Sequence, residues 1–452
     1  MACIRSISGL RVTNDELTQE LIASYSRAFA AYLPAGPIVI GRDGRPSGLW
    51  MEEVVISTLT AYGRVVISLG IAPTPTIQLE TEHSNAIGGI SITASHNPSE
   101  WNGMKFLNAE GVFLNAEENL DFWKYLENKT NQEYVNPGIC SIIENPSESH
   151  IAKIHVALQA LGIDIPHVKY PICAVVDAVN ASGSTFVPAL LESLDCECIP
   201  LYCDNTGEFP HTPEPLTQHL TDLMSAVRQY SAQLGIAVDP DADRLVLIDE
   251  KGNAIGEEKT IALCIMAILE CADLKQDSHS IAINMSTSSM SEILAKNNGW
   301  KVYRTPVGEI NVVQAMKEYD CIIGGEGSGG VILPACHYGR DSLIGISLII
   351  ALMKKTGKSL STLADMLPKT YMIKGKMPWS GSADEIFQRI EQHFAGTIIE
   401  IRKDDGIWIQ FSDGWMHVRM SNTEPIMRYI VECPEEKVVQ LYVQSLMIQF
   451  QD

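Results

Sequence analysis

Positive charge is scarce in this sequence. The chain has 452 residues, and its 33 lysines and arginines stand against 55 aspartates and glutamates, which gives a formal net charge of -22 at pH 7. A protein this acidic repels nucleic acid and anionic membrane surfaces, so we expect neither as a partner. An anionic small molecule could bind only where basic side chains gather locally.

Long apolar runs, a signal peptide and metal-type cysteine spacing are also missing. The longest apolar run, residues 343–353, is too short to cross a bilayer, and the first residues lack the pattern of a signal peptide. The 11 cysteines are odd in number and show no zinc-type spacing, so we interpret them as reduced thiols. These absences predict a soluble, cytoplasmic protein.

Strand-like apolar segments alternate with longer helix-like segments through most of the chain. Residues 37–41, 170–177 and 280–284 are strand-like, and each comes before a helix-like segment. This alternation predicts α/β layers with parallel strands. From residue 374 the pattern changes to one short helix at 383–394 and then to alternating segments, which predicts a small, mainly antiparallel sheet.

Segment 90–99 combines a hydroxyl, an imidazole and an Asn-Pro pair directly after an apolar strand. Ser95 is a candidate nucleophile with His96 beside it, and Asn97 and Pro98 predict the start of a helix. A serine hydroxyl needs help from a base or a metal ion, and a phosphorylated serine needs its charge neutralised. Either role calls for a divalent cation nearby. The alternative is a serine that only caps the helix.

Three aspartates at alternate positions offer ligands for such a cation. Asp239, Asp241 and Asp243 lie between the apolar segments 235–238 and 245–248. In an extended segment their carboxylates fall on one side and can converge on one ion. Oxygen ligands select a hard cation, which predicts one Mg²⁺ per chain. The alternative, an acidic surface turn, does not require apolar segments on both sides.

Two further segments carry groups that suit a sugar phosphate. Residues 419–425 combine the guanidinium of Arg419 with short hydroxyl and amide donors, a set that suits a phosphate group. Residues 324–330 hold Glu326 and Ser328 between five glycines. Glycines alone would indicate no more than a tight turn.

Together and in this order, the four segments resemble those of the phosphohexomutases. Enzymes of this family move a phosphoryl group between two hydroxyls of one sugar by way of an active-site phosphoserine. The resemblance spans nearly the whole chain. It implies a phosphoserine loop at 90–99, a magnesium loop at 239–244, a sugar-binding loop at 324–330 and a phosphate-binding loop at 419–425.

The resemblance also implies a role for each candidate residue. The catalytic residues would be Ser95, His96, Lys105 and Arg11, with Lys105 as a candidate acid or base. A phosphate on Ser95 would join Asp239, Asp241 and Asp243 as a ligand of the magnesium ion. Glu326 and Ser328 would contact the sugar hydroxyls. The phosphate-binding residues would be Arg419, Ser421, Asn422, Thr423, Arg428 and Arg244.

The implied fold has three similar mixed α/β domains and a smaller C-terminal α+β domain around a central cleft. The implied domains are 1–148 with the phosphoserine loop, 149–255 with the metal-binding loop, 256–370 with the sugar-binding loop and 371–452 with the phosphate-binding loop. Length alone predicts two to four domains. The polar stretch 128–149 is the clearest early boundary.

Two positions depart from the family pattern. Val12 replaces a usual glycine, and Gly330 replaces a histidine that many members carry, which leaves a proton-transfer role without its residue. His337 and Arg340 are the candidate substitutes. At Trp101 and Gly330 the sequence is more similar to the archaeal and Bacteroidetes-type branch, which includes phosphoglucosamine mutases, phosphomannomutases and phosphoglucomutases.

The expected reaction interconverts a hexose 6-phosphate and a hexose 1-phosphate through a phosphoserine and a bisphosphate intermediate. Glucosamine is the favoured sugar, with mannose and glucose as alternatives, and hexose 1,6-bisphosphate is the expected activator. We expect a monomer or a homodimer. Two other classes compete. One is a phosphatase of the haloacid dehalogenase type, with Asp239 as the nucleophile. The other is a catalytically silent sugar-phosphate sensor, which the changes at Val12 and Gly330 would fit.

Overall fold

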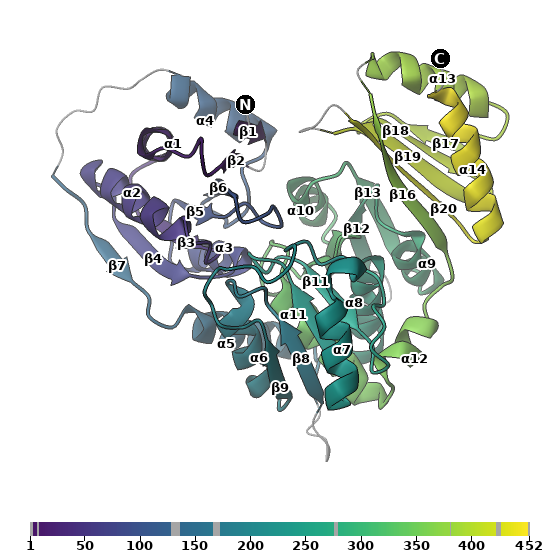
Figure 1. The fold of residues 1–452 in the computed structure, drawn as a ribbon, viewed down its shortest axis with the longest axis horizontal. Helices are drawn as coiled ribbons and strands as arrows, with labels where there is room; N and C mark the ends of the chain where they lie inside the picture. The colour runs from purple at the N-terminus through teal and green to yellow at the C-terminus, as the bar shows by residue number, and fades with distance from the viewer. Residues whose placement is uncertain are drawn as a thin grey trace. The chain divides into compact units, whose positions relative to one another are not determined.

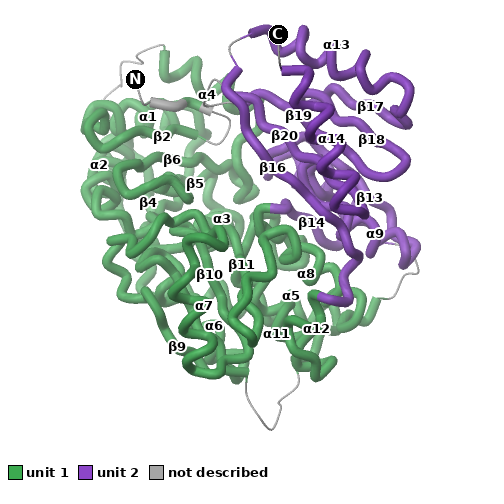
Figure 2. Tube along the Cα trace, turned by 45° about the vertical axis from the view of Figure 1, so that its right-hand side comes forward, with its two compact units in different colours: residues 1–276, 328–364 green, residues 277–327, 365–452 purple. Residues whose placement is uncertain are grey.

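The computed structural model describes residues 3–6, 9–127, 136–165, 172–274, 279–379, 381–421 and 426–450. Two compact units make up the chain, as the colours of Figure 2 show. The first unit contains residues 1–276 and 328–364, and the second contains 277–327 and 365–452. The predicted domain 256–370 contributes to both units, so the four predicted boundaries stay predictions.

The N-terminal sheet of the first unit has the order β1-β2-β6-β5-β3-β4-β7. Strands β5, β3, β4 and β7 pair in parallel, whereas β1, β2 and β6 join through antiparallel pairs. Its strands are β1 (Cys3–Ser6), β2 (Gly9–Thr13), β3 (Ile38–Arg42), β4 (Val66–Ile71), β5 (Gly88–Ile92), β6 (Trp101–Asn108) and β7 (Cys140–Ile142). Its helices are α1 (Gln19–Tyr32), α2 (Gly48–Ala61), α3 (Thr74–His83) and α4 (Ala116–Glu127).

Apolar side chains under α1, α2 and α4 form the core beside this sheet. Phe29, Phe106 and Phe122 are buried there, with ring centroids 4.7 to 5.5 Å apart. Burying each ring contributes about 1.5 to 3 kcal/mol. Helix α3 instead packs against β3 and β5, which brings its N-terminus close to the end of β5.

A second sheet of the first unit, with the order β11-β10-β8-β9, carries the aspartates. Strands β8, β9 and β10 pair in parallel, while β10 and β11 form an antiparallel pair. The strands are β8 (Cys173–Asp177), β9 (Glu197–Leu201), β10 (Leu234–Val238) and β11 (Leu245–Ile248). The helices are α5 (Pro146–Ala160), α6 (Gly183–Ser193), η1 (Thr217–His219) and α7 (Thr221–Tyr230). Residues 239–244 thus form the connection between β10 and β11.

Helix α11 (Ser342–Thr356) accounts for the longest apolar run in the sequence. Residues 342–354 are all buried, and the helix packs against α8 (Glu258–Cys271). A helix that is apolar on all sides belongs in the interior of a protein. Among the described residues, no helix has both the length and the apolar character needed to cross a membrane. The first unit also contains β15 (Gly330–Ile332), and α12 (Leu360–Asp365) begins in it.

The second unit contains a parallel set of strands and the predicted antiparallel sheet. The parallel order β13-β12-β14 comprises β12 (Ser280–Asn284), β13 (Lys301–Thr305) and β14 (Ile323–Glu326), with helices α9 (Ser289–Asn297) and α10 (Glu309–Glu318). The antiparallel order is β16-β20-β19-β18-β17. Its strands are β16 (Tyr371–Pro378), β17 (Glu400–Arg402), β18 (Ile407–Phe411), β19 (Gly414–Met420) and β20 (Ile426–Cys433). Helices α13 (Ala383–Phe394) and α14 (Glu436–Gln449) pack on this sheet (Figure 1).

Candidate active site

Ser95 lies in the loop between β5 and β6. Its backbone φ is +53°, in the left-handed region that a serine rarely adopts. The N–H of Asn97 donates to the carbonyl of Ala94, and the N–H of Trp101 donates to the carbonyl of Pro98. The predicted helix start at Asn97 and Pro98 is therefore wrong, because the loop turns twice and enters a strand. Ser95 is not a helix cap.

The guanidinium of Arg45 fixes the path of this loop. Arg45 is fully buried and donates to four main-chain carbonyls at 2.5 to 2.9 Å, those of Ser95, Asn97, Pro98 and Trp101. Asp43 balances its charge, since Asp43 Oδ2 accepts from Arg45 Nε at 2.9 Å. Each charge-assisted bond contributes about 1.5 to 3 kcal/mol. Together these bonds outweigh the roughly 1 to 2 kcal/mol that a left-handed residue costs.

The aspartate triad, Asp239, Asp241 and Asp243, lies fully buried in the turn between β10 and β11. The chain reverses because Ala242, with a φ of +50°, donates its N–H to the carbonyl of Asp239. One oxygen from each carboxylate lies within 4.8 Å of the others. The predicted convergence is present, but it arises from a turn and not from the alternation of an extended strand.

The serine and the triad are in direct contact within the first unit. Ser95 Oγ donates to Asp239 Oδ2 at 3.1 Å. The other oxygen of Asp239 accepts the backbone N–H groups of Asp243 and Arg244, both at 3.2 Å. Asp239 is thus held from both sides, and the fold brings a hydroxyl to the carboxylates across 144 positions of sequence.

Cationic side chains surround the triad and provide the local positive charge that an anionic substrate requires. Lys105 Nζ lies 2.5 Å from Asp241 Oδ2 and 3.5 Å from Asp243 Oδ2. Arg340 Nη2 lies 2.5 Å from Asp243 Oδ2, and Arg244 Nε is 3.8 Å from Asp243 Oδ1. Burial lowers the pKa of Lys105, but the two carboxylates raise it above its ordinary value.

Burial and neighbouring charges shift the pKa values of Asp239 and Asp241 in opposite directions. Burial raises the pKa of Asp239 well above its usual range, and the charges of Asp243 and Asp241 raise it further. Burial acts in the same direction on Asp241, but Lys105 and a hydrogen bond from Thr74 hold the pKa of Asp241 below its ordinary value. Thr74 Oγ1 donates to Asp241 Oδ2 at 2.8 Å. The sequence gives no sign of this role for Thr74, because a threonine before a proline carries no such signal.

The triad fits a divalent metal ion. Oδ1 of Asp241 and Oδ1 of Asp243 are buried and accept no hydrogen bond within the described part of the chain. Leaving a buried acceptor unpaired costs about 1 to 3 kcal/mol, and more for a charged group. A hard cation satisfies such oxygens. The three residues form a group that could hold a metal ion, as the magnesium prediction requires.

His96 and Arg11 both contact the Ser95 loop. Arg11 Nη1 donates to Asn97 Oδ1 at 2.8 Å, which ties β2 to the loop. His96 Nδ1 is 3.4 Å from Ser95 Oγ. The charge of Arg244, followed by burial and the charge of Arg11, lowers the pKa of His96 well below its ordinary value. The imidazole is therefore neutral at neutral pH.

Several of the predicted sugar-binding and phosphate-binding residues lie in the second unit, among them Glu326, Arg419 and Arg428. Glu326 is buried and accepts hydrogen bonds from Asn284 Nδ2 at 2.7 Å and from the N–H of Gly308 at 3.3 Å. Arg419 and Arg428 are partners across β19 and β20. Burial lowers the pKa of Arg419, with an opposing effect of Asp405. Nothing in the sequence pattern indicates this role for Asn284.

Ser328 is half-buried in the first unit, and Ser421 is half-buried at the end of β19, where its N–H donates to the carbonyl of Ile426 at 2.9 Å. Asn422 and Thr423 lie outside the described residues. Of the two candidate substitutes for the missing histidine, Arg340 reaches the triad. His337 instead bonds Asp341.

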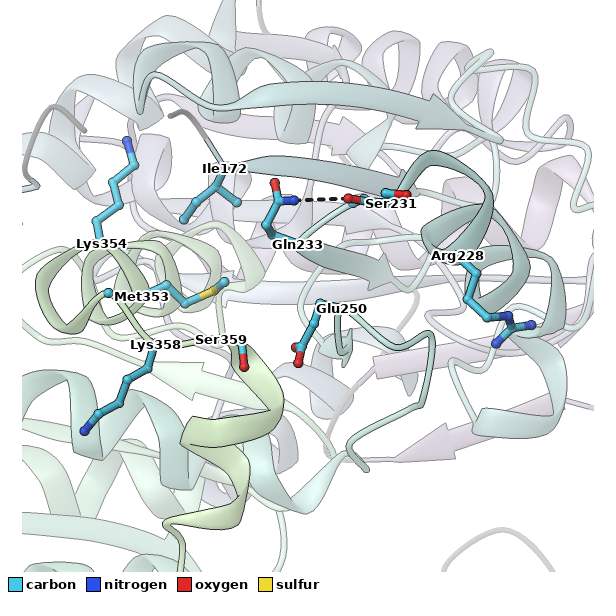
Figure 3. Close-up of a pocket in the computed structure, with 11 residues that line it drawn as sticks. Ile172, Arg228, Ser231, Gln233, Glu250, Met353, Lys354, Lys358 and Ser359 are labelled. Atoms are coloured by element: carbon cyan, nitrogen blue, oxygen red, sulfur yellow. Dashed lines mark hydrogen bonds between the residues drawn. The ribbon is translucent and has the colours of Figure 1, made fainter. Parts of the chain in front are cut away.

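A pocket of about 780 Å³ lies elsewhere in the first unit (Figure 3). Arg228, Glu250 and Lys358 are among the residues that line it. None of the predicted site residues lines this pocket, so it does not coincide with the candidate active site.

In the part of the chain that the structure describes, α/β sheets bring a serine hydroxyl against a buried aspartate triad, an arrangement that suits an enzyme of phosphoryl transfer. The family described as phosphoglucomutase/phosphomannomutase matches the chain in four parts: domain I over residues 6–133, domain II over 150–252, domain III over 257–371 and the C-terminal domain over 373–448. The chain therefore belongs to the phosphoglucomutase/phosphomannomutase family, whose members are phosphohexomutases.

Curated relatives and solved structures agree with this assignment. A "Phosphoglucomutase/phosphomannomutase" of Thermococcus kodakarensis is 36% identical, over 96% of this chain and 95% of the relative. A "Probable phosphoglucosamine mutase" of Methanopyrus kandleri is 31% identical, over 95% of this chain and 94% of the relative. A phosphoglucomutase/phosphomannomutase family protein from Burkholderia thailandensis, 21% identical, shares the fold with a TM-score of 0.85 over 99% of both chains. The family and fold predicted from the sequence are confirmed.

Proposed function

We propose that this mutase carries the phosphoryl group on Ser95 and interconverts the 6-phosphate and the 1-phosphate of glucosamine. The observation behind the carrier assignment is the 3.1 Å contact between Ser95 Oγ and Asp239 Oδ2, inside the buried aspartate triad. A phosphate on this oxygen would lie beside the residues that fit a dication. It would also be near the cationic side chains of Lys105, Arg244 and Arg340, which contact the triad.

The reaction requires two phosphoryl transfers on one sugar. In the first, the bond between phosphorus and Ser95 Oγ breaks, and a hydroxyl oxygen of the hexose monophosphate bonds to the phosphorus. The proton of that hydroxyl leaves to a base, and the serine oxygen regains a proton, which yields free Ser95 and a hexose 1,6-bisphosphate. In the second transfer, the bisphosphate returns its other phosphoryl group to Ser95. Positioning and charge neutralisation lower the barrier more than covalent chemistry does.

The residues around Ser95 would share the work of neutralising charge. Magnesium, when held by Asp239, Asp241 and Asp243, supplies two positive charges and polarises phosphate oxygens. Lys105 lies between two carboxylates, so we assign it to charge neutralisation. Arg11 and His96 would hold the serine loop and contact the transferring phosphate, and Arg244 would bind that phosphate as well.

A mutase that handles a bisphosphate needs a second phosphate site. We assign the phosphate that is not being transferred to the residues of the 419–425 segment and its neighbour: Arg419, Ser421, Asn422, Thr423 and Arg428. A planar guanidinium with short donors suits a phosphate dianion. Glu326 and Ser328 would contact the sugar hydroxyls.

Two features favour glucosamine over the other sugars. The buried carboxylate of Glu326 suits the ammonium group that glucosamine alone carries. In addition, the Methanopyrus kandleri relative is named a phosphoglucosamine mutase. The Thermococcus kodakarensis relative is named for glucose and mannose, so these sugars are the alternatives.

Further components follow from the same mechanism. We propose one Mg²⁺ per chain, and hexose 1,6-bisphosphate as an activator, because an escaped bisphosphate leaves Ser95 without its phosphate. We also propose a cytoplasmic enzyme that acts as a monomer or a homodimer.

The phosphatase alternative would make Asp239 the nucleophile and Ser95 dispensable. Both oxygens of Asp239 already accept hydrogen bonds, one from Ser95 and two from the backbone. Such an aspartate is suited to holding a ligand and not to attacking one, which favours the mutase. An intact triad also argues against a silent sensor, because a sensor has no use for a metal site.

The carrier assignment is tested by Ser95→Ala with Ser99→Ala, an exposed serine of the same loop, as the matched control. We expect Ser95→Ala to lose mutase turnover by about three orders of magnitude or more, with a circular dichroism spectrum like the wild type. Intact mass and peptide mapping should place a phosphate on Ser95 in the wild type and in Ser99→Ala. A Ser95→Ala enzyme that still hydrolyses the sugar phosphate, together with an Asp239→Asn enzyme that does not, would support the phosphatase instead.

The sugar assignment is tested by comparing kcat/KM for the 1-phosphates of glucosamine, glucose and mannose. We expect glucosamine 1-phosphate to lead, and Glu326→Gln to reduce its turnover more than that of the other two. Equal losses for all three sugars would remove Glu326 from the specificity assignment.

A further inference from the structure

Within the second unit, the turn between β17 and β18 lies against the strand that carries Arg419. This turn comprises residues 403–406. A Cβ atom at Gly406 would lie 2.8 Å from the Cα of Arg419 and 2.3 Å from the carbonyl oxygen of Val418. Glycine is therefore required for so close an approach, and the φ of +74° at Gly406 favours it too. The proposed reaction uses no residue of this turn.

The half-buried Asp405 joins this turn to the loop in front of α10. Asp405 Oδ2 accepts from the N–H of Val307 at 2.9 Å. The next N–H along the chain, that of Gly308, donates to Glu326 Oε1 at 3.3 Å. Asn284 Nδ2 donates to the same oxygen at 2.7 Å. Two consecutive N–H groups thus connect Asp405 with the carboxylate that is proposed to contact the sugar.

His417 joins the same turn to the strand of Arg419. Its Nε2 lies 2.7 Å from the carbonyl oxygen of Asp405. Because a carbonyl only accepts, Nε2 carries the hydrogen, and Nδ1 accepts from the hydroxyl of Ser286 at 3.1 Å. Burial lowers the pKa of His417, which keeps the ring in this neutral form. His417 and Arg419 are two positions apart on β19, so their side chains lie on one face of the sheet.

A third residue of this face holds the other end of β19. Trp415 is buried, and its Nε1 donates to Glu432 Oε2 at 2.6 Å and to Ser289 Oγ at 2.8 Å. The N–H of Ser289 donates to Glu432 Oε2 as well, at 2.7 Å. Trp415 and His417 therefore bind β19 to residues 286–289, which follow β12. Arg419 continues the face that these contacts hold in place.

We propose that Asp405 is a positioning residue that sets the separation between the phosphate held by Arg419 and the sugar contacted by Glu326. This inference rests on the function proposed above for those two residues. A sugar phosphate that is bound at both ends needs two sites whose spacing matches its length, and a misplacement of about 1 Å can cost about 100-fold in rate. Since Val307 and Gly308 are adjacent, a shift at Asp405 also moves the N–H that binds Glu326.

Three variants of the full chain separate the hydrogen bond of Asp405 from its charge. Asp405→Asn loses the charge but keeps an oxygen that can accept from the N–H of Val307. Asp405→Ala loses both, and Asp405→Glu keeps both but adds a methylene group that displaces the turn. We expect kcat/KM for glucosamine 1-phosphate to fall by about tenfold or more in the Ala and Glu variants, and by less than about threefold in Asp405→Asn. Asp404→Ala is the matched control, because this exposed carboxylate of the same turn pairs with Arg402.

Titration calorimetry tests the spacing without turnover. The dissociation constant of glucosamine 1-phosphate should rise in Asp405→Ala and Asp405→Glu, whereas that of inorganic phosphate, which bridges no two sites, should not rise. Equal losses in Asp405→Asn and Asp405→Ala, or Ala and Glu variants that match Asp404→Ala, would overturn the proposal. If Asp405→Ala does not fold, the Glu and Asn variants decide by the same comparison. A wild type that binds glucosamine 1-phosphate without turnover would contradict the proposed reaction, and the dissociation constants would still decide the role of Asp405.

Discussion

At the scale of single residues, Gly330 and Arg340 form a matched pair beside the aspartate triad. A Cβ atom at position 330 would lie 2.3 Å from Arg340 Cδ, so the arginine passes directly over the glycine. Its guanidinium then reaches Asp243 Oδ2 at 2.5 Å. The missing side chain at 330 is therefore what allows Arg340 to follow this path. The arginine thus takes the space that any larger side chain at position 330 would need.

Placing a histidine at position 330 should for this reason harm the protein. We expect Gly330→His to displace Arg340, to lower the free energy of unfolding by about 1 to 3 kcal/mol through overpacking, and to reduce turnover. Adding Arg340→Ala should recover part of the lost stability, because removing the arginine side chain makes room for the histidine. Urea denaturation of the single and double variants measures this coupling.

The control for this pair is Gly396→His, since a Cβ at Gly396 meets nothing within 4 Å. It should leave stability nearly unchanged. Strictly additive effects of Gly330→His and Arg340→Ala would contradict the shared-space explanation.

At the scale of elements, the loop that follows β9 lies against the loop that holds Arg45. A Cβ at Gly207 would lie 2.0 Å from the carbonyl oxygen of Gly44, and the Arg45 guanidinium lies 4.9 Å from the centroid of the Phe209 ring. His211 ties this loop to the end of β8, because its Nε2 lies 2.9 Å from Asp177 Oδ2. The pair of His211 and Asp177 thus helps to hold the loop after β9 against Arg45.

This pair makes stability depend on pH. Burial lowers the pKa of His211, but the hydrogen bond and charge of Asp177 raise it above its ordinary value of 6.5. A raised pKa means that the folded protein binds the proton more tightly than the unfolded chain does. The free energy that the pair of His211 and Asp177 adds to the folded state is therefore fully present below pH 6.5. It is lost as the pH rises through the pKa that His211 has in the folded protein.

We expect the free energy of unfolding of the wild type to decline over this range, and that of His211→Gln to decline less. Urea denaturation between about pH 5.5 and 8.5 measures the difference. His155→Gln serves as control, because its exposed ring contacts the hydroxyl of Ser193. Identical pH profiles for the wild type and His211→Gln would remove the pair from the stability of this loop.

The sequence predicted elements best where their pattern is local. Apolar runs predicted β3 and β12, and the change of pattern after residue 374 predicted α13, because such patterns involve residues that are close in sequence. The predicted helix start at Pro98 was wrong because Arg45, more than 50 positions away, binds the loop carbonyls and holds them in a non-helical conformation. The bond from Thr74 to Asp241 spans 167 positions, and no local pattern could reveal it.

At the scale of the whole molecule, a strongly acidic chain concentrates its cations where the chemistry is proposed. The net charge is -22, yet Arg11, Lys105, Arg244 and Arg340 all exert their charge on one buried site. The sequence predicted such a local focus from the charge balance and from motif order. Arg340, which the sequence offered as one of two candidate substitutes for the missing histidine, belongs to this focus, since its Nη2 lies 2.5 Å from Asp243 Oδ2.

Metal binding should act on one compact unit. The triad lies in the first unit, so Mg²⁺ at about 100 times its dissociation constant should add about 2.7 kcal/mol to the stability of that unit. Hydrogen exchange should slow in peptides that cover the Ser95 loop and residues 239–245. Peptides from β16 to β20 should not change.

Asp241→Asn is the control for this experiment, and it should lose the Mg²⁺ effect in the first unit. Equal protection of both units, or protection that persists in Asp241→Asn, would contradict a magnesium site at the triad.

The grip of Arg45 has a consequence for how this active site can vary over evolution. The guanidinium binds main-chain carbonyls alone in the Ser95 loop, and main-chain carbonyls are present whatever the side chains are. The shape of the loop is therefore insulated from most changes in its own composition. The exposed residues 98 to 100 can therefore change while one distant arginine keeps the loop in its path, whereas His96 and Asn97 have side-chain contacts of their own.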